Sequence, residues 1–393
     1  MRVGLDLPPQ IRVYGGFFIY AFSMGGIFPR LAEIQAALHV PQGIFGLSLI
    51  GTALGTLISL TFAAPLIEKL GHRLALGLIP LLAVLYTLAS FAQGPLALFL
   101  LLVPTGVTIG CIEIIINLEA DRVEHQVGRR IMNRAHGFWS LGFFAAGLVG
   151  AGFAQLGISP QLDLIIMIPV SLIGVALVLG KFTPAPHRDT AHAAPPPRFA
   201  RPTLAILVLV GVTLSAMILE GAGADWSAIY MRDEFHAAPF IVGFAAAVGA
   251  MLQATTRFFA DGFVERFSPV AVARTLLTVL GIGSITVFFA PTDLIALIGL
   301  GLLGVGTAVI FPLAMSAAAQ RTDRAAAINV AALAQLSFVA FLLGPPLLGF
   351  VAEHLGVRWS FGIGLPLVVL SFVAANALGR KPLAAAVHPV PGE

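Results

Sequence analysis

Glu113 interrupts the long apolar stretch 96–117. A carboxylate at the centre of a membrane helix costs about 2.5–3.5 kcal/mol, so its side chain should face the protein interior. Asn117 follows at i+4 on the same helical face, where its amide can hydrogen-bond the acid or a ligand. Carboxyl groups in low-dielectric surroundings exchange protons near neutral pH. We predict that Glu113 carries protons and that Asn117 binds ligand. The alternative is a purely structural carboxyl within an interhelical network.

A second acidic cluster surrounds four small residues, Gly221-Ala222-Gly223-Ala224. Helix is weakly held at such a stretch, and irregular backbone at membrane depth lines cavities. We predict that Glu220 carries protons and that Asp225 and Trp226 bind ligand. The alternatives are an Asp225 that is solvated or paired with Arg232, and a Trp226 that anchors the helix at the membrane interface.

His136 and Trp139 lie at i and i+3, on one face at the start of a helix, just after Arg134. Histidine changes charge near physiological pH, so we assign both residues to the ligand site, with a gating or structural His136 as the alternative. No second His or Cys recurs at ligand spacing, and we expect neither a metal nor a cofactor. An internal repeat aligns Ser23 with Glu220, which adds Tyr20, Ser23 and Met24 as candidates for the opposite wall.

Charged residues near the predicted helix ends suggest gates. Arg30 and Glu33 end the first helix at its outer end and are predicted to form an outer gate pair. At the inner end, a larger set is predicted to form charge pairs that close the cytoplasmic side. The alternative is that they are ordinary loop charges. This set consists of Glu68, Lys69, Arg122, Arg257, Asp261, Glu265 and Arg321.

The composition identifies the kind of molecule that must position these residues. Of the 393 residues, 58% are hydrophobic and 10% are charged, and the mean hydropathy is +0.96. Soluble domains average about 25% charged residues, so a soluble globular protein is excluded. We expect an all-α membrane protein with twelve helices of about 20 residues each. These run roughly over 13–31, 44–66, 74–93, 96–119, 134–157, 161–181, 203–230, 238–260, 270–290, 294–318, 327–352 and 359–379.

The proline-rich segment 182–202 breaks the pattern and predicts a cytoplasmic linker between two six-helix halves, 1–181 and 203–393. Placing both termini in the cytoplasm leaves only three of the 22 Lys and Arg residues outside. We therefore expect a multi-pass protein of the inner (plasma) membrane. Cys111 is the single cysteine, which excludes an intrachain disulfide.

The two halves resemble each other. A shift of 197 residues aligns Ile44-Phe45-Gly46 with Ile241-Val242-Gly243, and a shift of 199 aligns Arg122 with Arg321. Duplicated six-helix units around a midplane site are a known transporter design. With twelve helices and a central linker, the chain resembles the major facilitator superfamily along its whole length.

That superfamily carries a Gly-x-x-x-Asp-Arg-x-Gly-Arg-Arg-type loop after helix 2. Residues 64–73 here read Ala-Pro-Leu-Ile-Glu-Lys-Leu-Gly-His-Arg, which retains the charge signs and Gly71 but replaces the first Gly, the Asp and the Arg. A weaker echo follows helix 8 at residues 257–266. The resemblance implies a gating role for this loop, and the three replacements alter the geometry of the loop here.

Three strings also resemble the branch that includes the MosC and YbjJ membrane proteins. They are Glu113-Ile114-Ile115-Ile116-Asn117, residues 132–142 and residues 220–227. In that branch, Asp is commoner than Glu where Glu113 stands. The resemblance implies small polar, sugar-like or inositol-like substrates.

Together these features predict a monomeric secondary transporter, with a small solute and membrane lipid as its partners. We expect proton-coupled symport of a sugar- or polyol-like solute by alternating access. Proton-driven efflux of amphipathic molecules is the first alternative, because Phe17, Phe18, Phe22 and Phe28 could line an apolar pocket. A solute sensor that does not transport is an alternative of another class. No nucleotide-binding loop, catalytic constellation or nucleic-acid patch supports an enzyme or a nucleic-acid partner.

Overall fold

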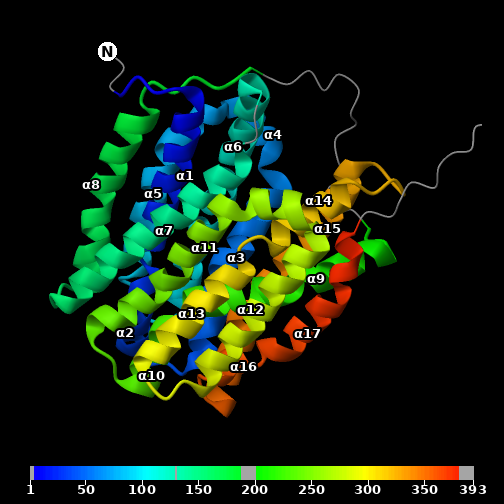
Figure 1. Cartoon of the computed structure of the whole chain (residues 1–393). Helices are drawn as coiled ribbons and strands as arrows, with labels where there is room; N and C mark the ends of the chain where they lie inside the picture. The colour runs from blue at the N-terminus through cyan, green and yellow to red at the C-terminus, as the bar shows by residue number, and fades with distance from the viewer. Residues whose placement is uncertain (1–3, 129–130, 187–200, 380–393) are drawn as a thin grey trace, which may run out of the picture.

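The computed structural model describes residues 4–128, 131–186 and 201–379. In this part of the chain, twelve helical spans are long and apolar enough to cross a membrane, as the sequence predicts. Figure 1 shows them as one bundle with the first six and the last six side by side. We call the end of the bundle near Pro9, Leu179 and Leu204 the linker side, and the end near Leu38 and Phe235 the distal side.

The first six spans, here called the N half, begin on the linker side. Their elements are α1 (Pro9–Gly25), η1 (Phe28–Arg30), α2 (Leu31–Leu38), α3 (Gln42–Phe62), α4 (Ala64–Leu70), η2 (His72–Leu74), α5 (Ala75–Ala89), α6 (Pro95–Val127), α7 (Met132–Gln155) and α8 (Pro160–Leu179).

The last six spans, here called the C half, also begin on the linker side, at Leu204. Their elements are α9 (Leu204–Gly221), η3 (Ala222–Trp226), α10 (Ser227–Phe235), α11 (Pro239–Phe267), α12 (Pro269–Phe289), α13 (Asp293–Thr307), α14 (Ile310–Ala319), α15 (Ala326–Leu355), α16 (Trp359–Gly362), α17 (Gly364–Ala374) and η4 (Ala375–Leu378).

Local sequence explains where many helices begin and end. Pro9, Pro95, Pro160, Pro239 and Pro269 each open a helix, at a position where the missing backbone N–H costs nothing. Gly128 ends α6 with a φ of 69°, a left-handed conformation that glycine adopts without strain. The helix α6 therefore runs about two turns beyond the predicted end at residue 119, and Glu113 lies near its middle.

Glycine also sets how closely helices pack within the N half. A Cβ on Gly51 or Gly55 of α3 would collide with the backbone carbonyls of Phe99 or Val103 in α6, and one on Gly106 with that of Thr52. Gly51 and Gly55 form a Gly-x-x-x-Gly pattern in the sequence, which predicts close helix contact, and the structure confirms it. This contact joins the second and fourth spans, as small-xxx-small motifs do in membranes.

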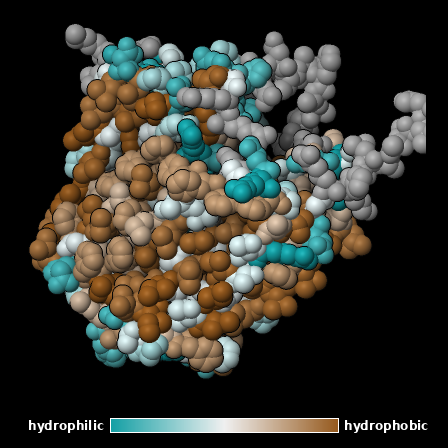
Figure 2. All heavy atoms as spheres, in the orientation of Figure 1, coloured by the Kyte–Doolittle hydropathy of each residue, from teal (hydrophilic) through white to brown (hydrophobic). Residues whose placement is uncertain are grey.

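The outer surface matches a membrane setting. In Figure 2 a broad hydrophobic belt covers the visible face, and hydrophilic residues gather mainly at the linker side, with a smaller group at the distal side. Many large apolar side chains are exposed, among them Leu100, Ile173, Phe289 and Val373. A surface of this kind is stable in lipid and not in water.

Candidate functional site

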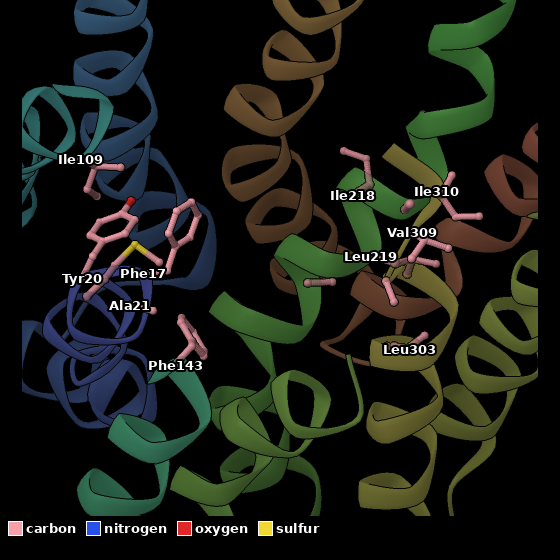
Figure 3. Close-up of a cluster of buried hydrophobic side chains, with 14 of the residues drawn as sticks. Phe17, Tyr20, Ala21, Ile109, Phe143, Ile218, Leu219, Leu303, Val309 and Ile310 are labelled. Atoms are coloured by element: carbon pink, nitrogen blue, oxygen red, sulfur yellow. The ribbon is translucent and has the colours of Figure 1, made fainter. Parts of the chain in front are cut away.

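A cavity lies between the two halves and encloses about 1230 Å³ of empty space, including the part open to solvent. Both halves supply its wall, which is mainly apolar and aromatic. Figure 3 shows two groups of buried side chains, one from the N half that includes Phe143 and one from the C half that includes Leu219 and Leu303. These three residues also line the cavity. The polar residues of the wall are Thr52, Tyr86, Trp139, Glu220, Asp225, Gln253 and Thr307.

The seventh span widens where the cavity wall carries its two acids. Residues Ala222–Trp226 form a π-helical turn. This irregular turn lies where the small residues of the sequence predict weakly held helix. Residues five apart in an α-helix lie about 140° apart, but the extra residue of a π turn brings them toward one face. Glu220 and Asp225 both reach the cavity as a result.

Glu113 is held by hydrogen bonds from two helices. The Tyr20 hydroxyl of α1 donates to Oε1 at 2.9 Å, and the Asn117 amide donates to Oε2 at 2.9 Å. The predicted i,i+4 contact between Glu113 and Asn117 is thereby confirmed. No ion pair to Glu113 is present among the described side chains, so both of its oxygens are bound by neutral donors.

Polar side chains also connect the halves at mid-depth. Arg257 of α11 donates to Ser140 Oγ of α7 at 2.7 Å and to the Ala308 carbonyl at 3.0 Å. Ser140 in turn donates to Gln253 Oε1 at 3.0 Å, and the Gln253 amide donates to Thr307 Oγ1 at 3.3 Å. Arg257 therefore lies inside the bundle rather than among the charges of the linker-side surface, where the sequence analysis places it.

The distal side is closed by bonds between the halves. Arg232 of α10 donates to Gln35 Oε1 at 2.7 Å and to the Ala32 carbonyl. Gln42 donates to Asp233 at 3.3 Å, and the Gly43 N–H donates to Glu353 at 2.9 Å. Arg232 therefore bonds across the halves and does not pair with Asp225, the alternative considered from sequence. We call these contacts the distal latch.

Arg30 is bonded within the N half. Its side chain is 0% exposed and pairs with Glu33 at 2.8 Å, as the sequence suggests, but also with Asp163 at 3.0 Å and the Ile158 carbonyl at 2.5 Å. Asp163 is itself 0% exposed. All of these partners lie in the N half, so Arg30 joins helices within that half, and Arg232 makes the contact between the halves.

On the linker side, Arg122 and Arg321 pair within their own halves, with partners outside the predicted set. Arg122 lies 3.6 Å from Glu119, which also contacts His72 and accepts a 3.1 Å hydrogen bond from the Ala185 N–H. Arg321 pairs with Asp323 at 3.3 Å. Among the described side chains, no charge pair crosses the halves here, so the predicted inner gate is not formed in this conformation. Lys69 and Glu265 are at the surface, and the side chains of Glu68 and Asp261 lie outside the described part.

Five predicted ligand-binding residues have different surroundings. Met24 and Trp139 line the cavity, whereas Ser23 is buried and bonds Ser171 Oγ at 2.7 Å. Trp226 is 0% exposed and packs on Gly349, so it neither faces the cavity nor anchors at an interface. His136 lies edge-on to the Phe17 ring at 5.2 Å. Ser23 and Trp226 are therefore packing residues here.

Three cavity or network residues were missed from sequence: Tyr86, Gln253 and Asp163. Each lies within a predicted membrane span, where polar side chains are rare, and this placement was the available signal. Tyr86 lines the cavity from α5, in the half opposite to Asp225. Their placement around one cavity depends on packing between distant segments.

Comparison with known proteins identifies the family. The model of the Major Facilitator Superfamily matches residues 13–222 and again residues 208–392. The chain belongs to the Major Facilitator Superfamily. Membership in this superfamily makes the protein a membrane transporter rather than an enzyme, and it confirms the resemblance found in the sequence.

Individual relatives agree with this assignment. The uncharacterized transporter y4wD of Sinorhizobium fredii is 28% identical, over 91% of this chain and 94% of the relative. Membrane protein MosC of Rhizobium meliloti is 23% identical, over 87% and 83%. The crystal structure of a D-xylose-proton symporter superposes with a TM-score of 0.70 at 12% identity, covering 94% of this chain and 96% of that one, and so shares the fold.

Proposed function

We propose that this transporter is a proton-coupled symporter that imports a small polar, sugar- or polyol-like solute by alternating access. The observation that carries the proposal is the bonding of Glu113, a mid-helix carboxyl group held by Tyr20 and Asn117 rather than by a base. A carboxyl with neutral donors can be protonated without leaving a buried cation unpaired. Proton and solute would then bias the same two-state equilibrium.

The latch and the cavity support alternating access. The distal side is bonded shut through Arg232, while the described charge pairs of the linker side stay within their own halves. This arrangement fits a state that is closed at the distal side. We assign the linker side to the cytoplasm, with the protein in the inner membrane. Opening the latch and closing the linker side would give the opposite state.

The lining of the cavity supports a solute with hydrogen-bonding groups. Trp139 offers a flat ring, and Glu220, Asp225 and Gln253 offer acceptors and donors from the C half. The same wall carries Phe28, Phe143 and Phe341. Those aromatic rings favour a second candidate function, proton-driven efflux of amphipathic solutes.

Flux in proteoliposomes tests the proposal. Purified protein is reconstituted with a pH-sensitive dye inside, and sugars and polyols are added under an imposed pH gradient. We expect uptake with lumen acidification, reduced at least tenfold by Glu113→Gln and retained in Asp293→Asn, which removes an acid at the distal loop. If amphipathic solutes leave the lumen while protons enter, the result would support efflux instead. Uptake without proton movement would refute coupling.

A further inference from the structure

The charge of the central cavity is one-sided. Among the described residues of its wall, Glu220 and Asp225 are the charged ones, and the wall holds no Lys, Arg or His. Neither carboxylate has a hydrogen bond or ion pair among the described contacts. Arg257 lies within electrostatic range of Glu220, but its guanidinium is bonded to Ser140 and Ala308.

The wide turn of the seventh span makes these acids a pair. In a regular α-helix, Asp225 would be rotated away from Glu220, and the π-helical turn at Ala222–Trp226 restores a shared face. A Cβ on Gly223 would meet nothing within 4 Å, so the space beside the pair is open. The sequence thus positions two acceptors around a free volume.

Unpaired carboxylates are costly in an apolar cavity unless a cation joins them. Aromatic side chains around the two acids also favour a cation, because an ammonium group is attracted to the faces of Trp and Tyr rings. Trp139 lies on the wall, with its ring 5.7 Å from that of Phe143, and Tyr86 lines the same cavity from the N half. A cation that contacts both halves can influence how the halves move.

From this arrangement we infer that the transported solute carries a protonated amine, which binds between Glu220 and Asp225. The inference rests on the proposed function and narrows its substrate class. The ammonium group donates up to three hydrogen bonds, enough for both carboxylates. The remainder of the solute, whether hydroxylated or aromatic, occupies the larger part of the cavity.

Matched ligands test the inference. Binding to the purified full-length protein is measured by calorimetry for D-glucosamine against D-glucose, and for tyramine against 4-hydroxyphenethyl alcohol. We expect the amine of at least one pair to bind at least tenfold more tightly than its neutral partner. A preference in the sugar pair indicates a hydroxylated solute, and one in the second pair indicates an amphipathic solute.

Variants connect the preference to the two acids. Glu220→Gln and Asp225→Asn keep side-chain shape, and each should remove most of the amine preference, whereas Asp293→Asn should leave it intact. Equal binding within both pairs, binding of none of the four ligands, or a preference that survives both substitutions would overturn the inference. Proton-coupled uptake of neutral sugars alongside equal binding would leave the proposed function standing, so the two failures are distinguishable.

Discussion

The Tyr20 hydroxyl donates a 2.9 Å hydrogen bond to Glu113 Oε1 and so joins the first span to the fourth. Tyr20 is 0% exposed and does not line the cavity. Its contact is therefore with the acid rather than with a solute, which gives it a positioning role.

Tyr20→Phe removes one of the two neutral donors to Glu113. A hydrogen bond to a charged group contributes about 1.5–3 kcal/mol, so we expect proton-coupled uptake to fall about tenfold. Solute affinity should stay within about twofold, because the ring keeps its packing. Initial rates in proteoliposomes and calorimetry on the same preparation separate the two quantities. A parallel loss of affinity would show that Tyr20 binds solute after all.

Arg232→Gln should open the distal latch. The substitution removes the charge-assisted bond to Gln35 and the bond to the Ala32 carbonyl, which shifts the two-state equilibrium about tenfold or more toward an open distal side. Reaction of Ala53→Cys, in a Cys111→Ser background, with an impermeant thiol reagent added from the distal side should accelerate accordingly.

The control for this experiment is Arg358→Gln. Arg358 is also at the distal end, but it bonds Glu234 and the carbonyls of Phe288 and Ala290, all within the C half. Its removal should leave labelling of the cysteine unchanged. Equal acceleration by both variants would mean that general loosening, and not the latch, controls access.

Asp163→Asn should destabilise the N half strongly. It leaves Arg30 buried with a reduced counter-charge, and breaking a buried pair costs about 3–5 kcal/mol. Thermal unfolding in detergent should show a clear fall in melting temperature, whereas Glu33→Gln, at a carboxylate 44% exposed, should cost under about 1 kcal/mol. A double Arg30→Gln, Asp163→Asn variant should recover part of the loss. No recovery would argue against pairing as the cause.

Gly55→Ala should disrupt the contact between α3 and α6. The new side chain would collide with the Val103 carbonyl, and forcing extra atoms into a packed contact typically costs about 1–3 kcal/mol. Gly77→Ala is the matched control, because a Cβ there meets nothing within 4 Å. Thermal unfolding compares the two, and equal melting temperatures would contradict the close contact.

At the linker side, Asn329 donates to Asp323 Oδ1 at 2.9 Å. This bond, together with the charge of Arg321, holds the pKa of Asp323 below its usual value. Because the folded-state pKa is depressed, the cluster contributes stability above the unfolded pKa of Asp323 and loses it as pH falls through the folded pKa. Asn329→Ala should raise this pKa, measured by carboxyl-carbon NMR with Asp323→Asn for assignment. An unchanged titration would refute the hydrogen bond as its main cause.

The sequence by itself determined the features that depend on local pattern. Apolar runs and proline or glycine boundaries predicted the twelve spans, and i,i+4 spacing predicted the bond from Asn117 to Glu113. The Gly-x-x-x-Gly spacing of Gly51 and Gly55 likewise predicted a close helix contact. These features follow from residues within one helix, where periodicity fixes which side chains are neighbours.

Only the tertiary structure decided which distant groups meet. Asp163 joins Arg30 from 133 residues away, and Gln35 receives Arg232 from 197 residues away. The periodicity of the sequence likewise did not predict the π-helical turn that brings Glu220 and Asp225 to one face of the cavity. Such contacts depend on the angles and rotations at which helices pack, which a one-dimensional pattern does not encode.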